Sequence, residues 1–137
     1  MNAAYQALDQ LSSGRDFDPP AKLLANIKPE AAVRLPPGAP YSIATNIAHT
    51  DIWQRVWLAQ LDGTPRLNPF PDFPAVPAEK WPEIRAEFLA NLVRARDLAA
   101  ACAPDDEERQ AKLLQVAIHG AYHMGQVKLL KRILRAR

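Results

Sequence analysis

Apolar residues recur at helical spacing along three long segments of this chain. Between residues 81 and 99 they follow one another three or four positions apart, at Trp81, Ile84, Phe88, Leu92, Ala95 and Ala99. That spacing puts a continuous apolar stripe on one side of an α-helix. Segments 42–61 and 105–135 carry similar stripes, and no segment keeps the strict alternation of a half-buried strand. The pattern predicts an all-α protein.

Capping residues and helix breakers set the limits of the expected helices. We expect a short helix at residues 2–13, a brief helical turn at 22–27, and a long helix that Ser42 caps and that ends near residue 61. The next helix follows Pro77 and reaches about residue 102. The last begins at Asp105, with Glu108 completing a capping box, and continues to about residue 135. The sequence therefore predicts a four-helix bundle in a single domain, residues 1–137.

The 13 prolines cluster between the expected helices. Segment 63–77 contains five of them, and an extended chain of this length covers a helix of about 20 residues, or roughly 30 Å. We therefore expect a long Pro-rich crossover that makes helices two and three parallel. The short turn near residue 104 predicts that helices three and four are antiparallel neighbours.

Composition excludes several classes of function. A net charge of +2 gives no reason to expect a nucleic-acid partner, and no apolar run is long enough for a membrane span. The last ten residues, KLLKRILRAR, hold five basic residues, which suit a helix C-terminus and a solvated face that also carries Gln110. A single cysteine, Cys102, and an N-terminus without a signal pattern predict a cytoplasmic protein with a buried thiol.

The chain contains only three histidines, and helical geometry assigns all of them to core-facing positions. His119 and His123 are one turn apart, on the same face as Val116, Val127, Leu130 and Leu134. His49 shares a face with Ile52, Trp53, Val56 and Trp57, whereas Asp51 points away from it and receives no catalytic role. A buried imidazole needs a partner, either a hydrogen-bonding group in the core or a shared divalent ion. Three such rings favour the ion.

Two familiar metal sites do not match this pattern. Gly120 follows His119, where a zincin protease has its glutamate, and no histidine has a glutamate three residues before it, as di-iron bundles require. A mononuclear three-histidine site with an open coordination position remains. Trp53, Tyr122 and Gln126 are candidate pocket or second-sphere residues, or else simple core and edge positions. Gly120 and Gly125 allow either close helix packing or free space beside the ion.

Two segments carry a resemblance to a known family. They are PPGAPYSIATNIAHTDIWQ at 36–54 and HGAYHMGQVKLLKR at 119–132. With this helix order, the chain resembles the DinB-like superfamily of bacterial four-helix bundles, which is unrelated to the polymerase of that name. The resemblance implies that His49, His119 and His123 are ligands of nickel or zinc, and that the protein is a homodimer. Characterised relatives transfer low-molecular-weight thiols to electrophiles or use a thiol in an isomerisation.

These observations lead to three functional hypotheses. The first is a metal-dependent enzyme whose ion activates a thiol or a water molecule towards a small-molecule substrate. The second is a non-catalytic scaffold that holds a metal or a ligand, and the third is a bundle whose histidines hydrogen-bond in the core. A second apolar set on the helix that contains His49 is a candidate dimer surface: Ile43, Ile47, Leu58 and Leu61.

Overall fold

The structure, a computed structural model, describes residues 2–65 and 67–135, and within them the chain is helical with no strand. The α-helices in these ranges are α1 (Ala3–Ser13), α2 (Pro20–Ala25), α3 (Pro29–Val33), α4 (Ile43–Leu61), α5 (Trp81–Ala100) and α6 (Glu107–Arg135). A 3-10 turn, Ala78–Lys80, leads into α5. The all-α prediction is confirmed.

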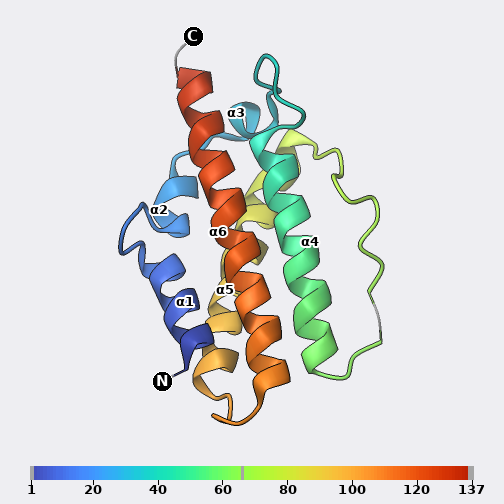
Figure 1. Cartoon of the computed structure of the whole chain (residues 1–137). Helices are drawn as coiled ribbons and strands as arrows, with labels where there is room; N and C mark the ends of the chain where they lie inside the picture. Colours follow the sequence, from blue (N-terminus) through green and yellow to red (C-terminus); the bar gives the residue numbers. More distant parts are fainter. Residues whose placement is uncertain (1, 66, 136–137) are drawn as a thin grey trace.

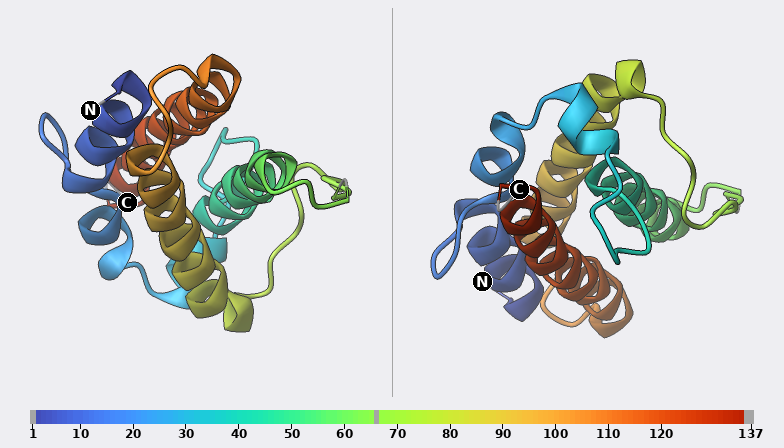
Figure 2. Two further views of the ribbon diagram at one scale, coloured as in Figure 1. Left: turned by 90° about the horizontal axis from the view of Figure 1, so that it is seen from below. Right: turned by 90° about the horizontal axis from the view of Figure 1, so that it is seen from above.

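Four of these helices, α1, α4, α5 and α6, form the bundle (Figures 1 and 2). Helices α4 and α5 run in the same direction and α6 runs in the opposite one (Figure 1). Helices α1 and α4 each pack on both α5 and α6. Helices α5 and α6 are antiparallel, as expected, but each packs mainly on α1 and α4. They therefore stand diagonally across the bundle, and the prediction that they are adjacent is wrong.

The crossover between α4 and α5 runs back along the outside of α4 (Figure 1), described on both sides of residue 66. Its second half is attached to α4 by side chains. The Thr45 hydroxyl donates a hydrogen bond to the Pro74 carbonyl oxygen at 2.8 Å, and the Trp53 indole N–H donates to the Asp72 carboxylate at 2.6 Å. The predicted Pro-rich crossover is thus confirmed, and it packs beside the helix that carries His49.

Two predicted N-terminal caps can be compared with the structure, and one of them is displaced by a residue. Ser42 caps α4 by accepting from the Thr45 amide at 3.1 Å, as predicted. In the last helix Asp106, not Asp105, accepts from the Arg109 amide at 3.1 Å, so α6 begins at Glu107. Either of two adjacent aspartates can cap a helix, and the sequence alone does not distinguish them.

The short helices before α4 differ from the prediction. Helix α2 begins at Pro20, two residues earlier than expected, and α3, at Pro29, was not predicted. Both prolines occupy a first helical position, where the missing N–H has no intrahelical partner to lose. These helices close one end of the core, because the Ile27 carbonyl accepts a hydrogen bond at 2.9 Å from the indole of the fully buried Trp81.

The proposed dimer surface on α4 is wrong. Ile43, Ile47 and Leu58 have no exposed surface, and Leu61 is half-buried. Helix α4 packs on α3 and α5 as well as on α6, so its second apolar set belongs to the core. Cys102 is buried, as predicted. None of the described helices is long and apolar enough to cross a bilayer.

Candidate metal centre

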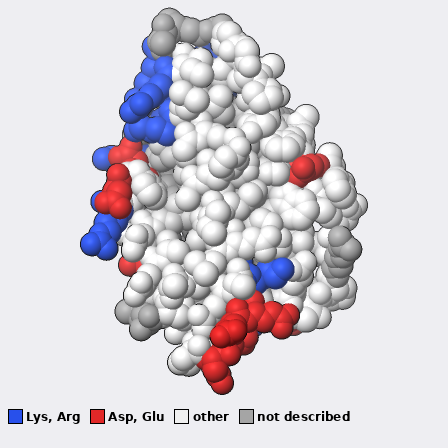
Figure 3. Space-filling view, viewed as in Figure 1, with Lys and Arg blue, Asp and Glu red and all other residues white. Residues whose placement is uncertain are grey.

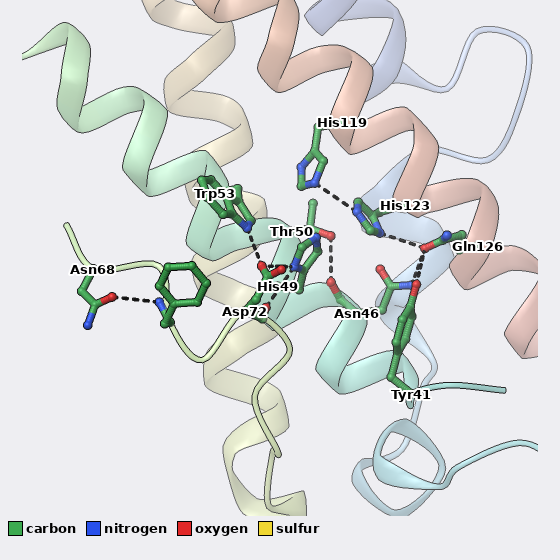
Figure 4. Close-up of polar contacts among 11 residues, drawn as sticks. Tyr41, Asn46, His49, Thr50, Trp53, Asn68, Asp72, His119, His123 and Gln126 are labelled. Carbon is green, nitrogen blue, oxygen red and sulfur yellow. Dashed lines mark hydrogen bonds and ion pairs between the residues drawn. The ribbon is translucent and has the colours of Figure 1, made fainter. Parts of the chain in front are cut away.

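The three histidines meet between α4 and α6 (Figure 4). Helix α4 supplies His49, and α6 supplies His119 and His123, one turn apart. One ring nitrogen from each lies within 4.8 Å of the other two, and the Nε2 atoms of His119 and His123 are 3.1 Å apart. His49 and His123 are buried, whereas His119 is half-buried. The structure therefore brings together all three residues that the sequence nominated.

Hydrogen bonds orient two of the three rings. The Nδ1–H of His123 donates to Gln126 Oε1 at 2.9 Å, and the Nδ1–H of His49 donates to the backbone and carboxylate oxygens of Asp72, both at 2.9 Å. In this tautomer Nε2 carries a free lone pair that can bind a metal ion. Histidine ligands in metal sites commonly donate their other ring N–H to an acceptor in this way, which fixes the tautomer and the ring orientation.

The donor set fits a divalent ion. His123 Nε2, unprotonated in this tautomer, lies 3.1 Å from His119 Nε2, so the pair needs either a proton or a cation between the two nitrogens. Imidazole nitrogens bind Zn²⁺ at about 2.0–2.1 Å, and three of them leave a coordination position for an exogenous molecule. The buried Nδ1 of His119 has no hydrogen-bond partner within the protein.

Burial keeps the α6 imidazoles neutral. Desolvation lowers the pKa of His119 to about 4, with further lowering from His123 and His49. Desolvation, followed by the neighbouring His49, lowers the pKa of His123 to about 4. Neutral imidazole is the form that ligates metals, so at neutral pH neither ring has to lose a proton before it binds an ion.

Gln126 lies at the centre of a hydrogen-bond network on one side of the histidines (Figure 4). Its Oε1 accepts from the Tyr41 hydroxyl at 3.0 Å and from Asn46 Nδ2 at 3.0 Å, in addition to His123. Three donors fix the amide oxygen, so Gln126 holds the His123 ring in place.

The crossover orients His49 from the other side. Asp72 accepts from His49 and from Trp53, and the Phe73 ring stacks on the His49 ring with centroids 3.9 Å apart and planes 5° from parallel. Tyr41 also stacks on Phe73, with ring centroids 4.8 Å apart. Trp53 therefore acts here as a donor to Asp72.

Sequence reasoning missed Asp72, Phe73, Tyr41 and Asn46. Asn46 precedes His49 by one helical turn, and this spacing was a usable signal. Asp72 and Phe73 lie in the crossover, where no periodicity relates them to a helix face. Asp51 lies away from His49, as predicted, but it is buried against α5, where it accepts from Asn91 at 3.0 Å.

An open groove of about 660 Å³ borders the cluster at His119. Its walls are largely apolar and include Trp57, Leu114, Ile118 and Tyr122. The Tyr122 side chain is exposed, and its ring meets the His123 ring edge-on at 5.1 Å. Of the three histidines, His119 is thus the one that a molecule in this groove contacts.

The fold and the cluster together define a class of protein, an α-helical bundle with a possible three-histidine metal site. The DinB superfamily model matches residues 21–127, so the chain belongs to the DinB superfamily. The matched range includes His49, His119 and His123 and leaves out α1. Comparison with curated proteins and with solved structures gives no significant match.

Proposed function

We propose that this protein binds one divalent ion, nickel or zinc, through His49, His119 and His123. The observation that carries the proposal is the convergence of the three ring nitrogens within 4.8 Å, with His49 and His123 each held at Nδ1 by an acceptor. The preference for nickel or zinc rests on the resemblance to DinB-like proteins and on the all-nitrogen donor set.

We further propose that the site is catalytic and acts on a small molecule. A bound divalent ion lowers the pKa of a coordinated thiol or water and so supplies a nucleophile at neutral pH. Asp72 and Gln126 hold the ligand rings, and the groove beside His119 receives the substrate. Transfer of a low-molecular-weight thiol to an electrophile is the reaction that the family resemblance favours, and hydrolysis is the second.

The alternative is a non-catalytic scaffold that holds a metal or a ligand. The groove supports catalysis over this alternative, because it is open to solvent and His119 forms part of its wall. Turnover by stoichiometrically loaded protein, measured on panels of thiol–electrophile pairs and hydrolysable esters, separates the two. Absence of turnover across both panels rejects the catalytic proposal and leaves metal binding intact.

A homodimer in the cytoplasm completes the proposal. With the apolar set of α4 buried, the dimer contact is proposed to use other exposed apolar side chains outside the groove, such as Val93 on α5 or Leu129 on α6. The cytoplasmic location is proposed from the single buried cysteine, Cys102. Light scattering tests the dimer, and a monomer contradicts it. Cell fractionation tests the location, and a protein found outside the cytoplasm contradicts it.

Elemental analysis tests the metal proposal directly. Protein exposed to nickel or zinc and freed of excess ion is expected to hold one ion per chain, whereas His123→Ala is expected to hold far less than one while keeping its helical circular dichroism. Gln115→Ala, also on α6 and at the groove, is the matched control and should load fully. Stoichiometric metal in His123→Ala contradicts the site.

A further inference from the structure

The two glycines inside α6 have different structural roles. A Cβ at Gly120 would lie 3.0 Å from Leu11 Cδ2, so this glycine allows α1 to pack closely on α6. A Cβ at Gly125 would meet no atom within 4 Å. Close packing therefore does not account for Gly125, although glycine in a helix interior is unfavourable.

Gly125 forms part of the wall of a pocket of about 480 Å³ between α6 and the segment that joins α1 to α2. Phe17 and Leu23 line it from the segment before α3, and Met124 and Lys128 line it from α6, together with Gly125. At about 100° per residue, these α6 positions lie on the side of the helix opposite His119 and His123. The pocket is thus separate from the histidine cluster, and its size is within the range of small-molecule sites.

Cationic side chains surround this pocket. Asp18 at the rim is shared by Lys128, 2.6 Å away, and Lys22, 3.7 Å away. Arg132 lines the pocket, its side chain is exposed, and it forms none of the ion pairs found in residues 2–65 and 67–135. Lys and Arg side chains gather along this edge of the molecule, in the upper left of the view in Figure 3.

The positive charge near the pocket also affects Lys131, which lies one helical turn from Lys128. Its ammonium donates to the Leu23 carbonyl oxygen at 2.7 Å. Burial and then the neighbouring charges of Arg135 and Lys128 lower its pKa. The region thus holds more positive charge than Asp18 balances, and an added anion is stabilised there.

We propose that this pocket binds an amphipathic organic anion, such as a medium-chain carboxylate. Its hydrocarbon chain lies against Phe17, Leu23 and Met124, in the space that the missing side chain of Gly125 leaves. Its charged group pairs with the Arg132 guanidinium, which suits carboxylates because its N–H groups match both oxygens. A neutral molecule of the same shape lacks this pairing, and a cation is repelled.

The position of Met124 provides a direct assay. The chain contains only two methionines, so ¹³C-methyl labelling gives two signals, and Met124→Leu assigns the one from the pocket. Full-length protein is titrated with octanoate below its micelle threshold, and with 1-octanol and octylammonium at the same concentrations. We expect a saturable shift of the Met124 signal with octanoate, at least ten-fold weaker binding of octanol, and no saturable response to octylammonium.

Two variants and one control locate the binding. Arg132→Gln, at an exposed position, is expected to weaken octanoate binding about ten-fold, and Gly125→Leu, which fills the pocket, is expected to abolish it. Lys112→Gln removes one positive charge from α6 about 30 Å along the helix from Arg132 and should bind as the unmodified protein does. Circular dichroism checks that each variant is folded, and Arg132→Gln decides the outcome if Gly125→Leu does not fold.

Three results overturn the proposal. The first is the absence of a saturable Met124 shift with octanoate. The second is equal binding of octanoate and octanol together with an unchanged affinity in Arg132→Gln, which marks a plain apolar surface. The third is a Met124 signal that moves with protein concentration alone, which assigns the pocket to contact with a second copy of the chain.

Discussion

At the scale of single residues, the histidine cluster depends on side chains that contact the rings. Asp72 fixes Nδ1 of His49, and Gln126 fixes Nδ1 of His123. Each acceptor also receives a further donor, Trp53 for Asp72 and Tyr41 for Gln126, so its own position is constrained. Such outer partners commonly change metal affinity by 10–100-fold when they are lost.

The Asp72 contact leads to a prediction. Asp72→Asn removes the negative charge that supports His49 but leaves the backbone oxygen as an acceptor, so we expect metal affinity to fall about ten-fold, at the low end of that range. Competition with a chelator of known affinity measures the change.

Asp51→Asn is the matched control, because Asp51 belongs to the same helix as His49 but is buried against α5. Its metal affinity should be unchanged. Equal affinities in Asp72→Asn and the unmodified protein would show that the carboxylate does not support the site.

At the scale of helices and connections, the sequence predicted what periodicity and capping determine. The apolar stripe from Trp81 to Ala99 and the Ser42 cap predicted two of the long helices. The proline cluster predicted the crossover and the parallel direction of the helices that it joins. Helix α3 was missed because Pro29 suggests a helix break as readily as a first helical position. The diagonal placement of α5 and α6 was missed because a short turn fixes direction, whereas the packing of α1 and α4 decides adjacency.

In the candidate site too, the residues whose positions follow from their own helix were predicted, and those that the tertiary fold brings in were not. Helical spacing found His49, His119 and His123, because their positions follow from their own helices. It did not find Asp72, whose approach to His49 depends on the path of the whole crossover. Gln126 was nominated from its position one turn after His123, which is one of its three hydrogen-bond donors; the other two, Tyr41 and Asn46, come from segments that no local pattern relates to α6.

At the scale of the whole molecule, α6 separates two chemically different regions. One side carries the histidines and, at its exposed edge, the apolar groove. Among the described residues, the central part of the face seen in Figure 3 is free of charged side chains, whereas Lys and Arg gather at its upper left edge and Asp and Glu at its lower edge. One helix thus contributes to both proposed sites.

The neutral histidines predict how the stability of the metal-free protein depends on pH. The pKa values of His119 and His123 are about 4 in the folded protein and 6.5 at their ordinary value, so between these limits the unfolded chain binds more protons. The free energy of unfolding therefore falls as the pH is lowered from about 6.5 to about 4.

Urea unfolding at pH 7.5 and at pH 5 measures this dependence. The unmodified protein is expected to lose more stability between the two pH values than the His119→Gln, His123→Gln double variant, in which both titrating rings are absent. The same loss in both proteins would mean that these imidazoles do not account for the acid sensitivity.

His49 and His119 are 70 positions apart, on helices that lie on either side of the crossover. A fragment with only one of these helices lacks the complete donor set. During synthesis on the ribosome, the coordination sphere can therefore assemble only after α6 has emerged and packed on α4. Ion capture would then be a late event in the maturation of the nascent polypeptide, and it would report that the tertiary structure is complete.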